Sequence, residues 1–132
     1  MRALSDTPPQ TSGQHARGRA RADQSLRLWI EIVRFANRLQ RDIDARLRQT
    51  HGQSLARFDV LSQLERAQRP LTVGELSAQL LTSTGNITGL LDRMERDGLL
   101  TRALSTTDRR SFLVEATPDG LDLFREMARD NA

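Results

Sequence analysis

The chain has 132 residues, which is enough for one domain with an apolar core, and 37% of them are hydrophobic. It contains no cysteine, so disulfide frameworks, thiolate metal sites and cysteine-based redox sensing are excluded. No apolar run approaches the roughly 18 residues of a membrane span, and the N-terminus lacks the apolar segment of a secretory signal. These features predict a cytoplasmic protein that does not bind a membrane.

The sequence contains no lysine, and its 20 arginines against 17 acidic residues give a net charge of +3. Arginine suits phosphate contacts because its planar guanidinium is always charged and donates several hydrogen bonds. Codon usage in a GC-rich genome explains an arginine-only composition more simply. The overall charge therefore says little about partners, and the places where the arginines lie matter more.

Residues 1–23 are rich in Pro, Gly, Ser, Thr and Gln and show no apolar period, which predicts a disordered tail. Arginines in this segment would add only non-specific attraction to phosphate, and a solvated tail is the favoured interpretation. Residues 24–132 are predicted to form one domain.

That domain begins with a long helix over residues 24–49. Its apolar side chains cover a wider arc than packing against a single core requires. The helix is therefore predicted to contact a second partner, such as another subunit. The apolar residues are Leu26, Leu28, Trp29, Ile30, Ile32, Val33, Phe35, Leu39, Ile43 and Leu47.

Two further helix starts follow. Ser54 is predicted to cap a second helix that runs to about Ala67, before Pro70 interrupts helical geometry. Thr72 and Glu75 have the spacing of a capping box, in which each side chain bonds the backbone N–H of the other residue. This box predicts a third helix that ends near residue 80.

A fourth helix is predicted over residues 84–97, capped by Ser83 and ended by Gly98. Together with the third helix it forms a helix-turn-helix pattern. Small and hydrogen-bonding residues occupy the N-terminal half of its polar side, the end that enters the major groove in such proteins. Gly85 and Gly89 are expected to leave room for close approach to a DNA duplex.

The segments 99–104 and 111–117 alternate as two strands of a hairpin, and Leu71 adds a short extended segment. The tip of this hairpin carries crowded charges, and an arginine on a narrow loop can enter the minor groove. An ordinary solvated turn is the alternative. Thr117 and Pro118 start a last helix over 118–132. The predicted fold is mainly α with a small β-hairpin, a winged helix-turn-helix of order α-α-α-α-β-β-α.

At this point the residues carry a family resemblance. LTVGELSAQLLTSTGNITGLLDRMERDGLLTR, followed by DRRSFLVEATPDGLDLF, resembles the MarR (multiple antibiotic resistance regulator) family over about residues 25–130. The most specific parts are the run LLDRMERDGLLTR, the Asp-Arg-Arg of the wing and the Thr-Pro-x-Gly helix start. The resemblance implies a transcriptional regulator that binds double-stranded DNA. It further implies a ligand-responsive repressor that binds a pseudo-palindromic operator as a homodimer.

Site residues carried over by position fall into three groups. The recognition-helix residues that would contact bases or phosphates are Ser83, Thr84, Asn86, Thr88 and Arg93. The wing residues are Asp108, Arg109 and Arg110. A pocket for a small aromatic or phenolic effector is implied between the dimer helices and the DNA-binding lobe. Its candidate lining residues, for each of which core packing is the favoured alternative, are Trp29, Val33, Phe35 and Phe58.

One departure from the family pattern concerns the C-terminus. Members of the family continue past this last helix into another, which interlocks with the first helix of the partner. This sequence stops at Ala132. We therefore expect either a truncated chain or a weakened dimer that depends on the first and last helices alone.

Other classes of protein fit less well. An enzyme is not expected, because there is no Gly-rich phosphate loop and no metal-ligand spacing, and no cofactor is implied. Carboxylates alternate with arginines on helix faces, such as Asp92 with Arg96 and Arg93 with Asp97, which is typical of solvated surfaces. A winged helix that binds protein or RNA would show aromatic or apolar anchors on the fourth helix. A metal-sensing regulator would need cysteine or clustered histidine ligands. The alternatives kept are a winged helix that binds protein or RNA and a metal-independent regulator of another winged-helix family.

Overall fold

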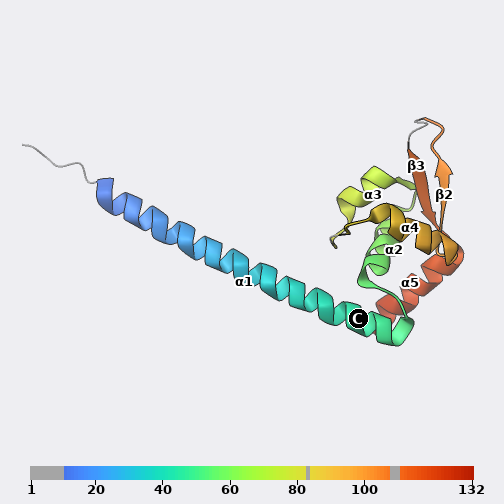
Figure 1. The fold of residues 1–132 in the computed structure, drawn as a ribbon, viewed down its shortest axis with the longest axis horizontal. Helices are drawn as coiled ribbons and strands as arrows, with labels where there is room; N and C mark the ends of the chain where they lie inside the picture. Colours follow the sequence, from blue (N-terminus) through green and yellow to red (C-terminus); the bar gives the residue numbers. More distant parts are fainter. Residues whose placement is uncertain (1–10, 83, 108–110) are drawn as a thin grey trace, which may run out of the picture. The chain divides into compact units, whose positions relative to one another are not determined.

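The computed structural model describes residues 11–82, 84–107 and 111–132. The chain divides into two units, Met1–Gln40 and Arg41–Ala132, and each is described by itself. Figure 1 shows the elements in chain order. They are α1 (Thr11–His51), α2 (Leu55–Ala67), β1 (Leu71–Thr72), α3 (Val73–Gln79), α4 (Ile87–Arg96), β2 (Leu100–Leu104), β3 (Phe112–Ala116) and α5 (Pro118–Asp130).

The first helix is longer than expected. We predicted a disordered segment over 1–23, but α1 begins at Thr11, so that prediction is wrong for residues 11–23. Residues 1–10 lie outside the described part of the chain. Alanine and arginine dominate residues 16–22, and both favour the helix strongly. Their propensity therefore outweighs that of Gly13 and Gly18, and the polar composition alone was a poor guide.

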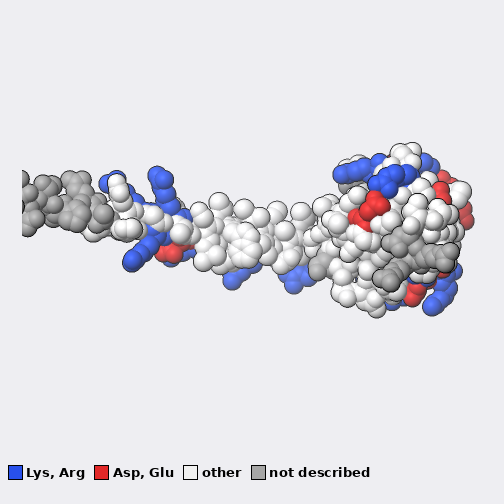
Figure 2. All heavy atoms as spheres, turned by 90° about the horizontal axis from the view of Figure 1, so that it is seen from above, with Lys and Arg blue, Asp and Glu red and all other residues white. Residues whose placement is uncertain are grey.

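Within the Met1–Gln40 unit, α1 keeps its large apolar side chains in solvent. Six of them are 47–62% exposed, namely Leu26, Leu28, Trp29, Ile32, Phe35 and Leu39. Figure 2 shows arginines gathered near the N-terminal end of this helix and a largely uncharged surface along the stretch that follows. The apolar arc expected from the sequence is therefore present in this unit as an exposed surface.

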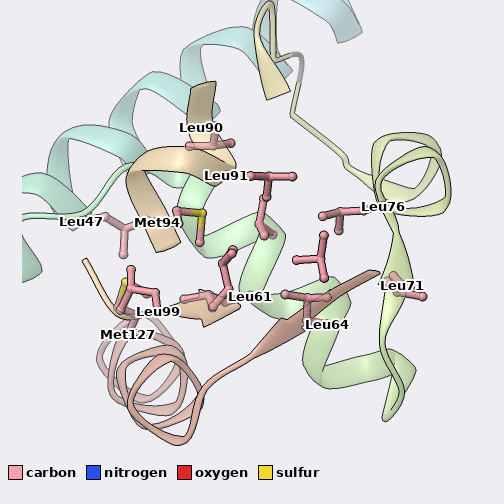
Figure 3. Close-up of a cluster of buried hydrophobic side chains, with 13 residues drawn as sticks. Leu47, Leu61, Leu64, Leu71, Leu76, Leu90, Leu91, Met94, Leu99 and Met127 are labelled. Carbon is pink, nitrogen blue, oxygen red and sulfur yellow. The ribbon is translucent and has the colours of Figure 1, made fainter. Parts of the chain in front are cut away.

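The Arg41–Ala132 unit is built around a core of leucine, valine and methionine side chains (Figure 3). The end of α1 contributes Leu47, and the other helices and strands surround it. Leu91 and Met94 of α4 are fully buried there, so the apolar stripe of this helix packs as its spacing predicts. The buried members are Leu47, Val60, Leu61, Leu64, Leu71, Leu76, Leu90, Leu91, Met94, Leu99, Leu100, Val114 and Met127.

The strands form an antiparallel sheet of order β1-β3-β2. The expected hairpin is confirmed as β2 and β3, whose register runs from Leu100 opposite Ala116 to Leu104 opposite Phe112. The short extended segment at Leu71 pairs with Val114 and adds a third strand. Both of these side chains are fully buried, so the pairing also closes one edge of the core.

One compact junction joins α4, β2 and α5. Gly98 ends α4 with a φ of +78°, the left-handed conformation that its position predicted. The Thr117 hydroxyl donates a 2.6 Å hydrogen bond to the Gly98 carbonyl and accepts one of 3.0 Å from the Gly120 N–H. The Thr117 N–H donates to the Leu99 carbonyl at 3.1 Å. The Thr-Pro-x-Gly sequence therefore fastens the start of α5 to Gly98 and Leu99, the residues that follow α4 and its C-cap.

Candidate nucleic-acid interface

The helix-turn-helix pattern is present as α3, a turn and α4. The capping box of α3 is confirmed: the Thr72 hydroxyl accepts from the Glu75 N–H at 3.1 Å, and the Glu75 carboxylate accepts from the Thr72 N–H. Arg69 donates a 2.6 Å hydrogen bond to Glu75, which lowers the pKa of that carboxyl. The start of α3 therefore forms as its local sequence predicts.

The start of α4 differs from the prediction. The helix begins at Ile87 rather than at residue 84, and its N-cap is Asn86. The Asn86 side-chain oxygen accepts a 2.9 Å hydrogen bond from the Gly89 N–H. Asparagine caps helices as well as serine does, and Gly85 disfavours a helix that starts earlier. Ser83, the expected cap, lies outside the described residues.

The two glycines expected to admit DNA have different surroundings. A Cβ on Gly85 would meet nothing within 4 Å. A Cβ on Gly89 would lie 2.6 Å from Asn86 Nδ2 and 3.3 Å from Arg93 Nη1. Gly89 therefore makes room for the capping side chain of its own helix, and its expected role in close approach to DNA stays a prediction.

The expected contact residues lie on the solvent side of α4 or just before it. Asn86, Thr88 and Arg93 are exposed, and Thr84 is half-buried in the preceding turn. Thr88 also borders an open cavity of about 330 Å³ between α3, α4 and the β2–β3 hairpin. The other residues that line this cavity are Val73, Gly74, Leu91, Arg102, Ser111 and Phe112.

Arg102 fastens the hairpin to α4. Its backbone N–H donates to Glu95 at 2.8 Å, and its guanidinium bonds Asp92 and, at 3.3 Å, Glu95. Burial lowers the pKa of this guanidinium, but the two carboxylates outweigh burial and hold the pKa above its usual value. The sequence predicted Asp92 beside Arg96 within α4, so it missed this pairing across two elements.

Two polar residues of α2 bond the chain on either side of α4, and neither was expected. Asp59 is 5% exposed and accepts hydrogen bonds from the turn between α3 and α4. Arg57 forms a 2.7 Å ion pair with Asp97, the C-cap of α4. The one available sequence signal was a carboxylate between two apolar residues, Phe58 and Val60, because buried charges need partners.

The predicted wing residues Asp108, Arg109 and Arg110 lie outside the described residues. The hairpin below them is described as far as Ser105 and Ser111. The Ser105 N–H donates to the Ser111 carbonyl at 2.9 Å, which continues the antiparallel pairing toward the tip. The assignment of these three residues to DNA contacts stays a prediction.

The candidate effector residues fall in both units. Trp29 and Phe35 are exposed on α1, where Val33 is half-buried. Phe58 packs on Phe124 of α5 with ring centroids 5.2 Å apart, next to the core. Core packing, the favoured alternative, therefore describes Phe58, while the effector pocket itself stays a prediction. Over the described ranges, no group of three or more histidine and acidic side chains could hold a metal ion.

The described part of the chain also contains no helix that is both long and apolar enough to cross a bilayer. A helix pair with a buried apolar stripe and an exposed polar face, followed by a hairpin fastened to the second helix, defines a winged helix-turn-helix protein. The described elements have this arrangement.

Known proteins place the chain within that class. The MarR family profile matches residues 51–111. The transcriptional activatory protein BadR of Rhodopseudomonas palustris is 32% identical over 112 residues, which are 83% of this chain and 63% of BadR. A crystal structure of a MarR family transcriptional regulator from Silicibacter pomeroyi has a TM-score of 0.71 and 32% identity, covering 83% of this chain and 74% of that one. The chain belongs to the MarR family, and the matched structure from Silicibacter pomeroyi is named a transcriptional regulator of that family.

A third comparison shows the fold alone. The DNA-bound structure of reduced AbfR is 18% identical, with a TM-score of 0.70 over 86% of this chain and 80% of that one. The family and the fold class predicted from the sequence are confirmed. The chain spans less than two thirds of the length of BadR.

Proposed function

We propose that this chain binds double-stranded DNA in a sequence-specific way as a homodimer and thereby regulates transcription. The observation that carries this proposal is that α4 is amphipathic. Leu91 and Met94 are buried, whereas Thr88 and Arg93 are exposed to solvent. A helix of this kind after a tight turn fits the major groove, where side chains reach base edges. Thr88 would read bases or phosphates, and Arg93 would bind phosphate.

The wing supplies the second part of the proposed interface. Arg102 holds β2 against α4, so the hairpin and the recognition helix would approach DNA as one body. Arg109 or Arg110 would then enter the flanking minor groove, oriented by Asp108. This contact adds affinity and, through groove width, some sequence preference.

The dimer would form through α1. Its exposed apolar side chains form an apolar surface of the kind that monomeric proteins rarely leave in water. A second copy of the same helix could cover them, and a two-fold dimer would present two α4 helices to two half-sites. A regulator of this kind acts where the bacterial chromosome lies, so we place it in the cytoplasm.

The family also supplies the proposed regulation. A small aromatic or phenolic effector would favour a dimer in which the distance between the two α4 helices no longer matches the distance between half-sites, about one helical turn of DNA. The effector would thereby shift the population toward a form that does not bind DNA. The relative BadR is named an activatory protein, so repression stays a prediction from the family resemblance. The role proposed is regulatory, with no catalytic step and no cofactor.

Selection of bound duplexes from a random pool tests the whole proposal. We expect a pseudo-palindrome with half-sites about ten base pairs apart. Recovery of single-stranded RNA in a parallel selection, with no enriched duplex, would show that the winged helix serves another partner.

A further inference from the structure

Asp59 places a buried carboxylate under the turn of the helix-turn-helix. It lies on α2, and one of its oxygens, Oδ2, accepts three short hydrogen bonds. The donors are the Leu81 N–H at 2.8 Å, the Thr82 N–H at 2.7 Å and the Thr82 hydroxyl at 2.8 Å. Gln63 donates to the other oxygen at 3.4 Å. Hydrogen bonds to an ionised acceptor are stronger than neutral ones, so this carboxylate fixes the turn firmly.

Arg57, two residues earlier on α2, holds the opposite end of the same segment. Its guanidinium pairs with Asp97 at 2.7 Å, and its side chain is only 16% exposed. Asp97 follows the last residue of α4 directly, whereas Leu81 and Thr82 precede the first residue. One helix therefore bonds the chain on both sides of the recognition helix.

We propose that Arg57 and Asp59 form a two-point clamp, the α2 clamp, that sets the position of α4 for base recognition. Neither residue needs to touch DNA. Both act through the backbone and cap that they hold, so they are positioning residues. This inference rests on the proposed function, because it names what orients the helix that would enter the major groove.

The core alone would not fix that position. Leu90, Leu91 and Met94 anchor the apolar stripe of α4, but apolar packing has little directionality. Hydrogen bonds constrain both distance and angle. A recognition helix must hold its side chains within about 0.5 Å of the geometry that bidentate base contacts need. The Asp97 ion pair holds the C-terminal end of α4, and the Asp59 bonds hold the turn that leads into α4 from α3.

The experiment uses the full chain and the duplex that the wild type selects from a random pool. Asp59→Asn keeps the size of the side chain but removes the charge that accepts three bonds. We expect hydrogen exchange at the Leu81 and Thr82 amides to accelerate and affinity for the selected duplex to fall about tenfold, the effect of losing charge-assisted bonds. Affinity for an unrelated duplex of equal length should change much less, because phosphate contacts tolerate small displacements.

Met127→Ala is the matched control. It removes buried volume in α5 and lowers stability without touching the turn. It should leave the exchange of both amides and the ratio of specific to non-specific affinity at wild-type values. Thr82→Val is a second probe, which deletes one of the three donors and should give a smaller change in the same direction. Thr82→Val also replaces Asp59→Asn as the test variant if Asp59→Asn does not fold.

Unchanged amide exchange, or an equal loss of specificity in Asp59→Asn and Met127→Ala, would overturn the proposal. If the wild type selects no duplex, the proposed function fails instead. The exchange measurement on the free protein then still decides whether Asp59 holds the turn.

Discussion

Gly120 lies so close to the backbone of Leu99 that no side chain fits there. A Cβ at this position would lie 2.0 Å from the Leu99 carbonyl oxygen and 3.3 Å from a methyl group of Leu61. The first of these neighbours is backbone, so relief would require α5 to move away from Leu99, the residue before β2. The glycine of the Thr-Pro-x-Gly sequence is therefore explained by contact distance, because its backbone conformation is an ordinary helical one.

Gly120→Ala should lower the free energy of unfolding by about 2–3 kcal/mol, the cost of overpacking a close backbone contact. Gly18→Ala is the control, since nothing lies within 4 Å of that position in α1. It should be neutral or stabilising by up to about 1 kcal/mol. Urea denaturation followed by circular dichroism measures both, and equal effects would contradict the contact argument.

Asn86 was expected to read bases, but the structure makes it the cap of α4. Asn86→Ala should cost about 1 kcal/mol of stability, whereas Asn86→Ser should keep most of the cap. If both variants lose the same preference for the selected duplex, the amide reads a base as well. If only the alanine variant loses it, capping is the whole role of Asn86.

At the scale of elements, local signals predicted the starts and ends of helices well. The caps Ser54, Thr72 and Thr117 and the terminator Gly98 act through residues one to four positions away, so a single sequence reveals them. The predicted start of α4 was wrong because the sequence contains two good caps, Ser83 and Asn86, three residues apart. The low helix propensity of Gly85, which lies between them, favours the later cap.

Pairings between elements were not predictable in the same way. Arg57 and Asp97 are forty positions apart, and Asp59 reaches residues 22 and 23 positions further on. The spacing rules of a single helix instead assigned Asp92 and Asp97 to neighbours on α4. The bonds of Arg57 and Asp59 to the chain on either side of α4 therefore could not be read from the spacing within one helix.

The link between α1 and α2 gives a pH-dependent prediction. Hydrogen bonds from Arg48 at 2.8 Å and from the Leu55 N–H at 2.9 Å hold the pKa of the Asp44 carboxyl below its ordinary value. A carboxyl with a lowered folded-state pKa stabilises the protein above its unfolded pKa of about 3.9, and this contribution disappears as the pH falls through the lowered value.

Asp44→Asn should therefore be less stable than the wild type at pH 7, and the two should converge as the pH falls below about 4. Urea denaturation at a series of pH values from 7 to 3 gives the comparison. Asp122→Asn is the control, because its carboxylate and Arg125 form an exposed pair of little energetic value. A constant difference between Asp44→Asn and wild type across this range would exclude the linkage.

The wing predicts a change in salt dependence. Arg109→Ala combined with Arg110→Ala should weaken binding to the selected duplex by about 1–3 kcal/mol and flatten the plot of log affinity against log salt. Arg125→Ala, on the exposed side of α5, removes equal charge per residue and should leave the slope unchanged. Gel-shift titrations at several salt concentrations measure the slope, and an unaltered one in the double variant would refute the wing assignment.

At the scale of the whole molecule, the proposed function requires two copies of the chain. Leu28→Glu with Ile32→Glu places charges on two neighbouring exposed apolar positions of α1. Burying an aliphatic side chain contributes about 1.5–3 kcal/mol. We therefore expect the dissociation constant of the dimer to rise at least about tenfold in the double variant. Arg38→Glu, on the charged side of the same helix, is the control. Light scattering across a dilution series decides, and a wild-type monomer at every concentration would remove the dimer from the proposal.

The placement of Trp29 has an optical consequence. The chain contains one tryptophan and no tyrosine, and the indole is 61% exposed on α1. Intrinsic emission therefore reports on α1, the helix through which the proposed dimer would form. Docking of another helix over the indole would shift the emission to shorter wavelength and protect it from iodide. The protein thus carries a built-in fluorophore for its own assembly.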